Sequence, residues 1–130
     1  MKYLLDTHIV LWLAENSPKL SDTAKAIILD EANEKYVSIA SCWEVSVKLS
    51  LRKFDLNGGT YEFMHIIQEN GFKLFQLKIN YLTFLETLPF YHRDPFDRLI
   101  IATSISEKSI LLTDDSQFLN YTGVGLEIAR

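Results

Sequence analysis

Cysteine and histidine are scarce in this chain, which has one cysteine and three histidines among its 130 residues. The single cysteine, Cys42, excludes an internal disulfide and fits a reducing compartment. The histidines lie far from one another and from Cys42, so no spacing typical of a zinc site is present. The sequence therefore excludes a domain that depends on disulfides or zinc for its stability.

Long apolar runs are also missing, because no stretch of the chain is long enough to span a bilayer. The N-terminal stretch MKYLLDTHIVLWLA has the apolar character of a signal peptide. However, Asp6 and His8 interrupt it, and no small-residue cleavage site follows. We therefore expect a cytoplasmic protein that does not bind membranes.

The chain also has no excess of basic residues. It has 13 Lys and Arg residues, 17 Asp and Glu residues and a net charge of −4. This balance argues against a domain that holds nucleic acid through a broad basic surface. It does not argue against an enzyme that meets phosphates through a bound cation, because the cation reverses the local charge.

The composition that remains is that of an ordinary globular domain, with 48% hydrophobic and 23% charged residues. We find no internal repeat and no low-complexity segment. Short β-type runs alternate with longer helical runs along the whole chain. This pattern predicts one α/β domain over residues 1–130, a three-layer α/β/α sandwich around a central parallel sheet of four to five strands.

The boundaries of the elements follow from turn residues and caps. Ser21 and Pro95 are expected at the starts of two helices. The β-branched segment 42–53 could be a strand, but Ser41 and Glu44 form an S-x-x-E capping box that favours a helix. The predicted strands cover 2–5, 35–40, 72–77, 109–113 and, as a candidate fifth, 125–129. The predicted helices cover 7–15, 21–34, 42–53, 60–70, 80–88 and 95–108.

Acidic residues stand at the junctions between strands and helices. They follow the first, second and fourth predicted strands or open the helix before the fourth, and are Asp6, Glu44, Asp94, Asp97, Asp114 and Asp115. Taken singly, each fits a helix cap, because acids are favoured at helix N-termini. Taken together, they should converge, because parallel strands have their carboxyl ends on one edge of the sheet.

Converging carboxylates repel one another, by about 4 kcal/mol at about 4 Å and an intermediate effective dielectric. Either some of these carboxyl groups have raised pKa values, or a hard divalent cation lies among them. Because the candidate ligands are oxygens, with no Cys and little His, Mg²⁺ or Mn²⁺ fits better than Zn²⁺.

Four segments carry these acids in order: YLLDTHIVLWLA, VSIASCWEVSVKLSLRKF, HRDPFDRLIIATS and LLTDDSQF. Together they closely resemble the acidic motifs of PIN-domain ribonucleases and, more narrowly, of the VapC-type toxins of type II toxin–antitoxin pairs. The resemblance extends over nearly the whole chain. It implies a metal-dependent endonuclease acting on RNA, which forms a homodimer and is held inactive by a cognate antitoxin protein.

Carried over by position, the resemblance implies that four acids form the catalytic metal site. Asp6 matches the first acid, Glu44 the second, Asp97 the third and Asp115 the fourth, with Thr113 as the hydroxyl neighbour of Asp115. Mg²⁺ usually takes only one or two direct carboxylates. We therefore expect Asp6 and Asp97 closest to the metal. Glu44 and Asp115 would bind through water, orient the nucleophile or hold a second ion.

Residues beside these four acids are secondary candidates. The doubled acid in LLTDDSQF leaves Asp114 as a competitor of Asp115. Asp94 is expected to cap its helix and to support the site. His8 and His92 are expected to pack or to form hydrogen bonds rather than to bind a metal.

Basic residues near the acids have two possible roles, as phosphate contacts or as partners in ion pairs. Arg93 and Arg98 could contact a phosphate or form an ion pair with a neighbouring aspartate. Lys48 stands one helical turn beyond Glu44, and an i,i+4 ion pair is the plain explanation, with a phosphate contact as the alternative.

Two other functions remain open from the sequence. The first is an aspartyl-phosphate phosphatase with Asp6 as nucleophile. That chemistry usually needs a second Asp two residues later, where this chain has His8. The second is a binding module without catalytic activity, in which the acids are only caps or ligands of a structural cation.

Overall fold

Five short strands pair in a fully parallel sheet in the order β3-β2-β1-β4-β5. The computed structural model describes every residue from 1 to 130. The chain starts at the centre of the sheet, moves outward to β3 and then returns to the other side of β1 at β4. This reversal between β1 and β4 is where open parallel sheets place their ligands, at the carboxyl ends of the strands. The strands are β1 (Lys2–Leu5), β2 (Glu34–Ser38), β3 (Lys73–Phe75), β4 (Ile110–Leu112) and β5 (Glu127–Ala129).

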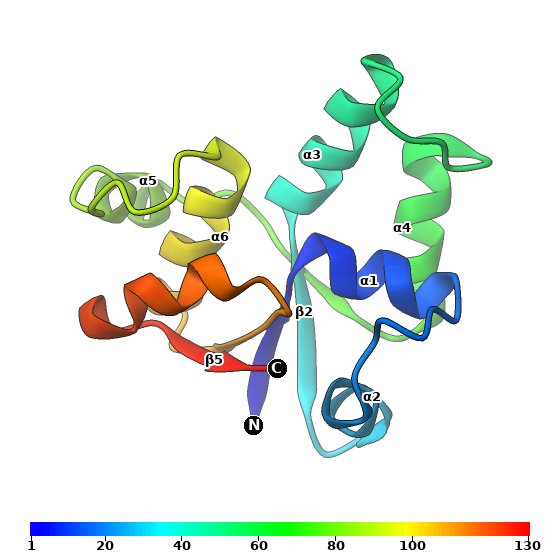
Figure 1. Cartoon of the computed structure of the whole chain (residues 1–130), viewed down its shortest axis with the longest axis horizontal. Coiled ribbons are helices and arrows are strands. Elements are labelled where there is room, and N and C mark those ends of the chain that lie inside the picture. Colours follow the sequence, from blue (N-terminus) through cyan, green and yellow to red (C-terminus); the bar gives the residue numbers. More distant parts are fainter.

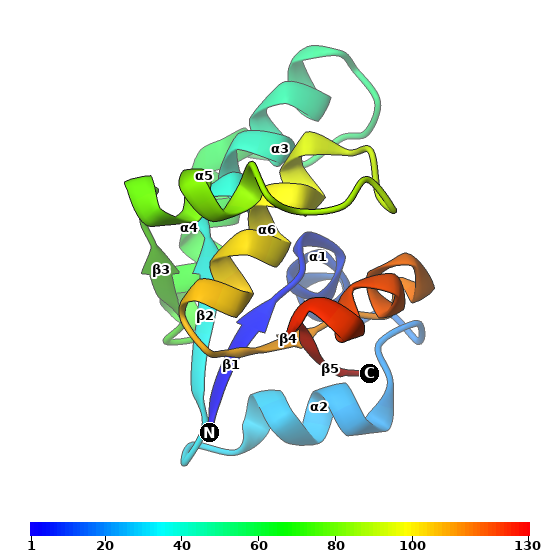
Figure 2. The same ribbon diagram turned by 90° about the vertical axis from the view of Figure 1, so that its left-hand side faces the viewer.

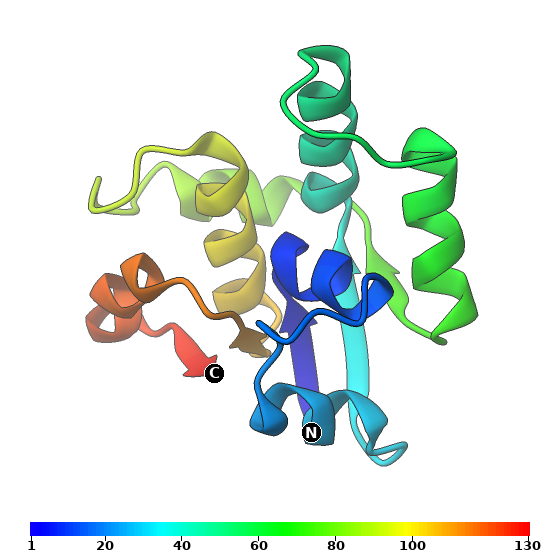
Figure 3. The same ribbon diagram turned by 45° about the vertical axis from the view of Figure 1, so that its right-hand side comes forward.

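Helices cover both faces of the sheet (Figures 1 and 2), so the prediction of a three-layer α/β/α fold is confirmed. One layer holds α1, α2 and α4, and the other holds α5, α6 and η1. Figure 3 shows α3 rising from the end of β2, between α6 and α4. The helices are α1 (Thr7–Ala14), α2 (Asp22–Leu29), α3 (Ile39–Ser50), α4 (Gly59–Glu69), α5 (Ile79–Leu85), α6 (Pro95–Ser106) and the 3₁₀-helix η1 (Ser116–Val124). None of these helices is long and apolar enough to span a membrane.

The central strand explains why the sheet needs a helical layer on each side. Leu4 and Leu5 of β1 are both fully buried and point to opposite faces, because side chains alternate along a strand. Leu5 packs in a cluster that includes Val10 of α1, whereas Leu4 packs in a second cluster that includes Ile100 of α6. A strand that is covered on both faces appears in the sequence as an unbroken apolar run. The buried strand therefore places the next residue, Asp6, at the edge of the core.

The second predicted helix is shorter than expected. Ser21 caps it as predicted, since its hydroxyl accepts a hydrogen bond from the Ala24 N–H at 3.0 Å. The helix ends at Leu29 instead of residue 34, because the Asp30 carboxylate accepts the Ala32 N–H and turns the chain. Helix periodicity alone does not reveal this side-chain turn.

The predicted capping box at the start of α3 is wrong. Ser38 is the N-cap, and its hydroxyl accepts the Ala40 N–H at 3.0 Å. The strand before it ends two residues earlier than predicted, so Ser41 and Glu44 both lie inside the helix. Residues three apart share one helix face. Both side chains are buried there and bond the hydroxyl of Thr7.

Candidate metal centre

Asp6 is held at the carboxyl end of β1 with both carboxylate oxygens bonded. It is only 5% exposed. It caps α1, because Oδ1 accepts the Thr7 N–H at 2.8 Å, while Oδ2 accepts the Thr113 hydroxyl at 2.8 Å. Burial raises the pKa of Asp6, although the Thr113 bond, the charge of His8 and the Thr7 N–H partly offset this. A fixed, buried carboxylate at this position has the rigidity that a metal ligand requires.

Thr113 was expected beside Asp115, but it joins two of the acids. Its hydroxyl donates to Asp6 and accepts the backbone N–H of Asp115 at 3.1 Å. The residue follows β4, the strand that pairs directly with β1. Thr113 therefore ties the first and fourth acids together across the reversal in the sheet.

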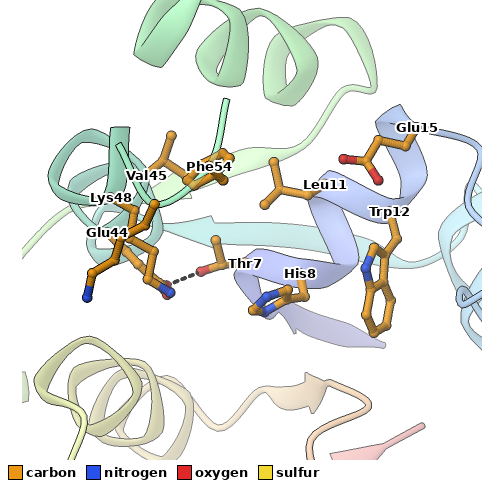
Figure 4. A pocket seen from close by; sticks show the side chains of 10 residues that line it. Thr7, His8, Leu11, Trp12, Glu15, Glu44, Val45, Lys48 and Phe54 are labelled. Carbon is orange, nitrogen blue, oxygen red and sulfur yellow. Dashed lines mark hydrogen bonds and ion pairs between the residues drawn. The ribbon is translucent and has the colours of Figure 1, made fainter. Parts of the chain in front are cut away.

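Glu44 enters the same region from α3 and is 3% exposed. Its Oε1 lies 2.7 Å from the Thr7 hydroxyl, and its Oε2 lies 2.5 Å from Lys48 Nζ. Figure 4 marks the bond to Thr7 with a dashed line, seen from the side of the neighbouring pocket. Burial alone would lower the pKa of Lys48, but the hydrogen bond and charge of Glu44 raise it. The predicted i,i+4 ion pair is thus confirmed.

Asp97, in the first turn of α6, lies at the centre of the acidic group. Burial raises its pKa to about 8, and the charges of Asp6, Asp94, Glu44 and Asp115 add to this effect. Its neighbours in space therefore include the other acids assigned by position. The charges of the other acids act on Asp97, as expected for carboxylates that meet at one edge of the sheet, and burial raises the pKa values of both Asp97 and Asp6.

Asp94 caps α6, as predicted from the sequence. Its Oδ1 accepts the N–H groups of Phe96 at 2.8 Å and of Asp97 at 3.2 Å. Asp97 contributes no capping bond of its own, so its carboxylate is free of the helix end. Asp94 is therefore a support that leaves Asp97 available to the site.

The doubled acid after β4 divides into two roles. Asp115 caps η1 through Oδ1, which accepts the Gln117 N–H at 2.9 Å, while its Oδ2 lies 3.9 Å from His92 Nε2. Asp114 is exposed, and its Oδ1 lies 3.9 Å from Arg130. The geometry favours Asp115 as the acid that joins the group.

Arg98 does not form the ion pair that was one of its two roles expected from the sequence. The residue is 4% exposed, and its guanidinium lies over the Phe90 ring at 3.9 Å. It forms no ion pair with an aspartate, because its N–H groups donate to backbone carbonyls of Leu85, Leu88, Pro89 and His92. Arg98 therefore fixes the segment between α5 and α6.

His92 is the residue at the site that sequence reasoning undervalued. Its Nε2 lies 2.9 Å from Asp97 Oδ2, inside the acidic group. Nothing in the sequence distinguishes it from the other histidines except its place two residues before the Asp94 cap. Only the folding back of the segment held by Arg98 brings it to the acids.

The donor set fits a hard divalent cation. Ligand atoms of His92, Asp97 and Asp115 all lie within 4.8 Å of one another, and Asp6 and Glu44 carry further carboxylates beside them. Carboxylate oxygens are the ligands that Mg²⁺, Mn²⁺ and Ca²⁺ prefer. A cation at this place would offset the burial and the neighbouring negative charges that raise the pKa of Asp97.

Two hollows flank the acids. A cleft of about 240 Å³ is lined by Asp6, His8, Trp12, Asp114 and Asp115. A larger cavity of about 340 Å³ lies between α1 and α3. Figure 4 shows Thr7 between its two sides, with Leu11 and Trp12 of α1 on one side and Phe54 beside Glu44 and Lys48 on the other. The larger cavity is lined by Thr7, His8, Leu11, Trp12, Glu15, Glu44, Val45, Lys48, Lys53 and Phe54.

A family model of the PIN domain matches residues 3–124, which is nearly the whole chain. The chain belongs to the PIN domain family. Members of this family are generally nucleases that use divalent metals. No curated protein matches the chain.

Solved structures share the whole PIN fold at low sequence identity. A chain of VapBC2 from Rickettsia felis, bound to a promoter DNA fragment, is 16% identical with a TM-score of 0.72, covering 99% of this chain and 98% of that chain. A chain of VapBC-1 from nontypeable Haemophilus influenzae is 17% identical with a TM-score of 0.70, covering 99% and 97%. A chain of the VapBC-5 toxin–antitoxin system from Mycobacterium tuberculosis is 14% identical with a TM-score of 0.65, covering 99% and 98%. These likenesses show the fold.

Proposed function

We propose that this protein is a Mg²⁺- or Mn²⁺-dependent endoribonuclease and the toxin of a VapC-type toxin–antitoxin pair. The observation that carries the proposal is the gathering of Asp6, Glu44, Asp97 and Asp115 at the reversal of a PIN-domain sheet. The likeness in fold to chains of toxin–antitoxin complexes supports the narrower assignment. Carboxylates that repel one another are expected to lie close together where they bind a cation.

The residues of the chain divide the work of phosphodiester hydrolysis. When bound, a divalent cation supplies Lewis-acid charge that activates water and neutralises the phosphate. Asp6 and Asp97 are the expected direct ligands, and the bonds from Thr7 and Thr113 fix the orientation of Asp6. Glu44 is oriented by Thr7, and it can accept a proton or hold a water molecule once Lys48 moves aside.

The phosphatase alternative has little support in this geometry. Position 8, where an acid–base Asp is usual, is a histidine that lines both hollows. A covalent phosphate trapped on Asp6 would revive this alternative.

Metal-dependent cleavage of RNA is the direct test. Purified protein freed of any antitoxin is incubated with a pool of structured RNAs in Mg²⁺, in Mn²⁺ and in EDTA. We expect cleavage with either metal, none in EDTA, and a loss of at least about 100-fold for Asp6→Asn, because a ligand of the reacting centre is removed. Undiminished cleavage by the Asp6→Asn variant would contradict the assignment of the site.

Cleavage that persists in EDTA would exclude the metal mechanism. If the unaltered chain cleaves no RNA, titration calorimetry with Mn²⁺ separates two explanations. Metal binding without cleavage would support a structural cation in a binding module. The absence of both would remove the proposed function altogether.

The larger cavity offers a place for a base of the RNA. It shares Thr7 and Glu44 with the acidic group, and it combines the aromatic rings of Trp12 and Phe54 with the ammonium group of Lys53. Stacking of a base on an aromatic ring contributes about 1–3 kcal/mol. The cavity is therefore suited to the nucleotide next to the scissile phosphate.

Replacing Trp12 with Ala should weaken RNA binding without disturbing the chemistry. We expect the KM for a cleaved RNA to rise about 5- to 100-fold, as the loss of one stacked base implies, with kcat within a few-fold of the unaltered value. Tyr61→Ala, which removes a 90% exposed ring on α4, is the matched control. A drop in kcat with unchanged KM would place Trp12 outside the binding path.

The antitoxin is expected to use the same acidic edge. A basic side chain of the partner would find Asp6, Asp97 and Asp115 close together on a chain of net charge −4. The VapC-type assignment also implies a homodimer. Exposed aromatic side chains near the acids, Trp43 on α3 and Phe90 and Tyr91 before α6, are available for protein contacts.

A further inference from the structure

The imidazole of His92 is fixed by the chain around it. The residue is 8% exposed, and its ring lies 5.6 Å from that of Phe118. Its backbone N–H donates to the Tyr121 hydroxyl at 2.8 Å, and its carbonyl accepts a bond from Arg98. Because main chain and ring are both held, the direction in which each ring nitrogen points is set by the fold.

One hydrogen bond decides which ring nitrogen carries the hydrogen. His92 Nδ1 accepts the backbone N–H of Asp94 at 3.2 Å. A backbone amide can only donate, so Nδ1 must present its lone pair and cannot carry a hydrogen. The ring hydrogen is therefore on Nε2. The bond that sets this arrangement comes from the residue that also caps α6.

Nε2 points into the acidic group with no aligned partner. It is a buried polar atom without a hydrogen bond, although Asp97 Oδ2 lies 2.9 Å away and Asp115 Oδ2 lies 3.9 Å away. Buried donors are normally bonded, and an unbonded donor in a functional site calls for an explanation. Here the donor faces the oxygens of two acids that come from different elements, α6 and the N-terminus of η1.

We infer that His92 is a positioning residue, whose Nε2–H faces the carboxylate of Asp97 at 2.9 Å and orients it, and that His92 itself is not a ligand of the cation. The inference rests on the proposed cation at this site. The N–H lies on the Oδ2 side of Asp97, whose Oδ1 accepts no hydrogen bond and is left for the cation. Direct coordination through Nε2 would require the hydrogen to move to Nδ1, where it would clash with the Asp94 N–H.

The alternative is that His92 ligates the cation together with Asp97 and Asp115, whose ligand atoms lie within 4.8 Å of one another. The two roles predict different spectra. Manganese bound to a nitrogen ligand shows a strong coupling to the directly bound ¹⁴N nucleus, whereas manganese in an oxygen-only site does not.

The experiment is pulsed electron paramagnetic resonance of the full chain loaded with Mn²⁺, combined with Mn²⁺ titration calorimetry. We expect no coupling to a directly bound ¹⁴N. We expect His92→Phe, which keeps a ring but has no N–H, to weaken Mn²⁺ binding by about 10- to 100-fold, as the loss of an orienting partner does at other metal sites. His92→Gln, which retains an N–H donor, should recover part of the affinity. His65→Phe, at an exposed position on α4, is the matched control.

The outcomes separate the two levels of the proposal. Strong ¹⁴N coupling in the unaltered chain that disappears in His92→Phe would overturn the role as donor and make His92 a ligand. Unchanged affinity in a folded His92→Phe would also overturn it, and thermal unfolding of each variant shows whether it is folded. If the unaltered chain binds no Mn²⁺, the cation site itself fails, and the role of His92 fails with it.

Discussion

Asp97→Asn is expected to make the cation-free protein more stable at pH 8 while abolishing its nuclease activity. The pKa of Asp97 is raised to about 8, first by burial and then by the acids around it. The unfolded chain lacks this environment, so its Asp97 titrates near 3.8. A neutral amide of the same shape avoids the burial of a charge among other charges.

The sign of the pH dependence follows from proton binding. Between about pH 4 and pH 8 the folded protein holds the Asp97 proton more tightly than the unfolded chain does. The contribution of this group to the free energy of unfolding is therefore complete below about pH 4. It is lost as the pH rises towards 8. Since Asn does not titrate, the stability gained by the variant should grow from about pH 5 to pH 8, to on the order of 2–4 kcal/mol.

Urea unfolding in EDTA at several pH values measures this difference, with Asp55→Asn, an exposed acid in the loop before α4, as the matched control. Adding Mg²⁺ or Mn²⁺ should stabilise the unaltered chain more than the variant, because only the former retains the ligand. If the variant is instead less stable at pH 8 without metal, the charge of Asp97 does not destabilise the folded protein. Nuclease activity in the variant would exclude Asp97 from the reaction.

The acidic residues of the site could be recognised from the sequence because the fold class brings them together. Acids at Asp6, Glu44 and Asp97 each fit a cap, and only the parallel sheet required them to meet. That inference needs nothing more than alternating strands and helices, both of which are strong periodic signals. The preference of Asp for the N-cap and of Pro for the next position also predicted the cap of α6, Asp94.

The boundaries of helices and strands, and the long-range partners of side chains, were harder to predict from the sequence. Ser38 and Ser41 are both good N-caps, and the choice between them depends on where β2 ends against its neighbours. Arg98 and His92 depend on a segment that folds back over α6, which no local pattern encodes. The residues misread from the sequence are thus those whose partners lie in irregular structure.

Arg98 carries the second large expected effect, although it touches none of the acids. Its buried guanidinium donates to backbone carbonyls of Leu85, Leu88, Pro89 and His92. Replacement with Met keeps much of the apolar bulk but leaves the carbonyls of Leu88 and His92 without a donor, whereas Leu85 and Pro89 keep bonds from the Leu88 N–H and the Tyr121 hydroxyl. Each buried acceptor left unbonded costs about 1–3 kcal/mol, so we expect a total loss of about 3 kcal/mol or more.

Arg98→Lys tests whether the shape of the guanidinium matters as well as its charge. A single ammonium cannot reach carbonyls spread along the segment, so this variant should also be destabilised by about 2 kcal/mol or more. Arg93→Met, at an exposed neighbour, should change the free energy of unfolding by less than about 0.5 kcal/mol. Urea unfolding measures all three variants against the unaltered chain.

The same variants connect the segment to the site. Because Arg98 holds the carbonyl of His92, loosening the segment should release the ring that faces Asp97 and weaken Mn²⁺ binding in whatever fraction remains folded. A phosphate-binding arginine would behave differently, with unchanged stability and a raised KM for RNA. An Arg98→Lys variant of normal stability and raised KM would therefore return Arg98 to the phosphate-binding role first considered for it, whereas joint losses of stability and metal affinity would establish it as the residue that holds His92 at the acids.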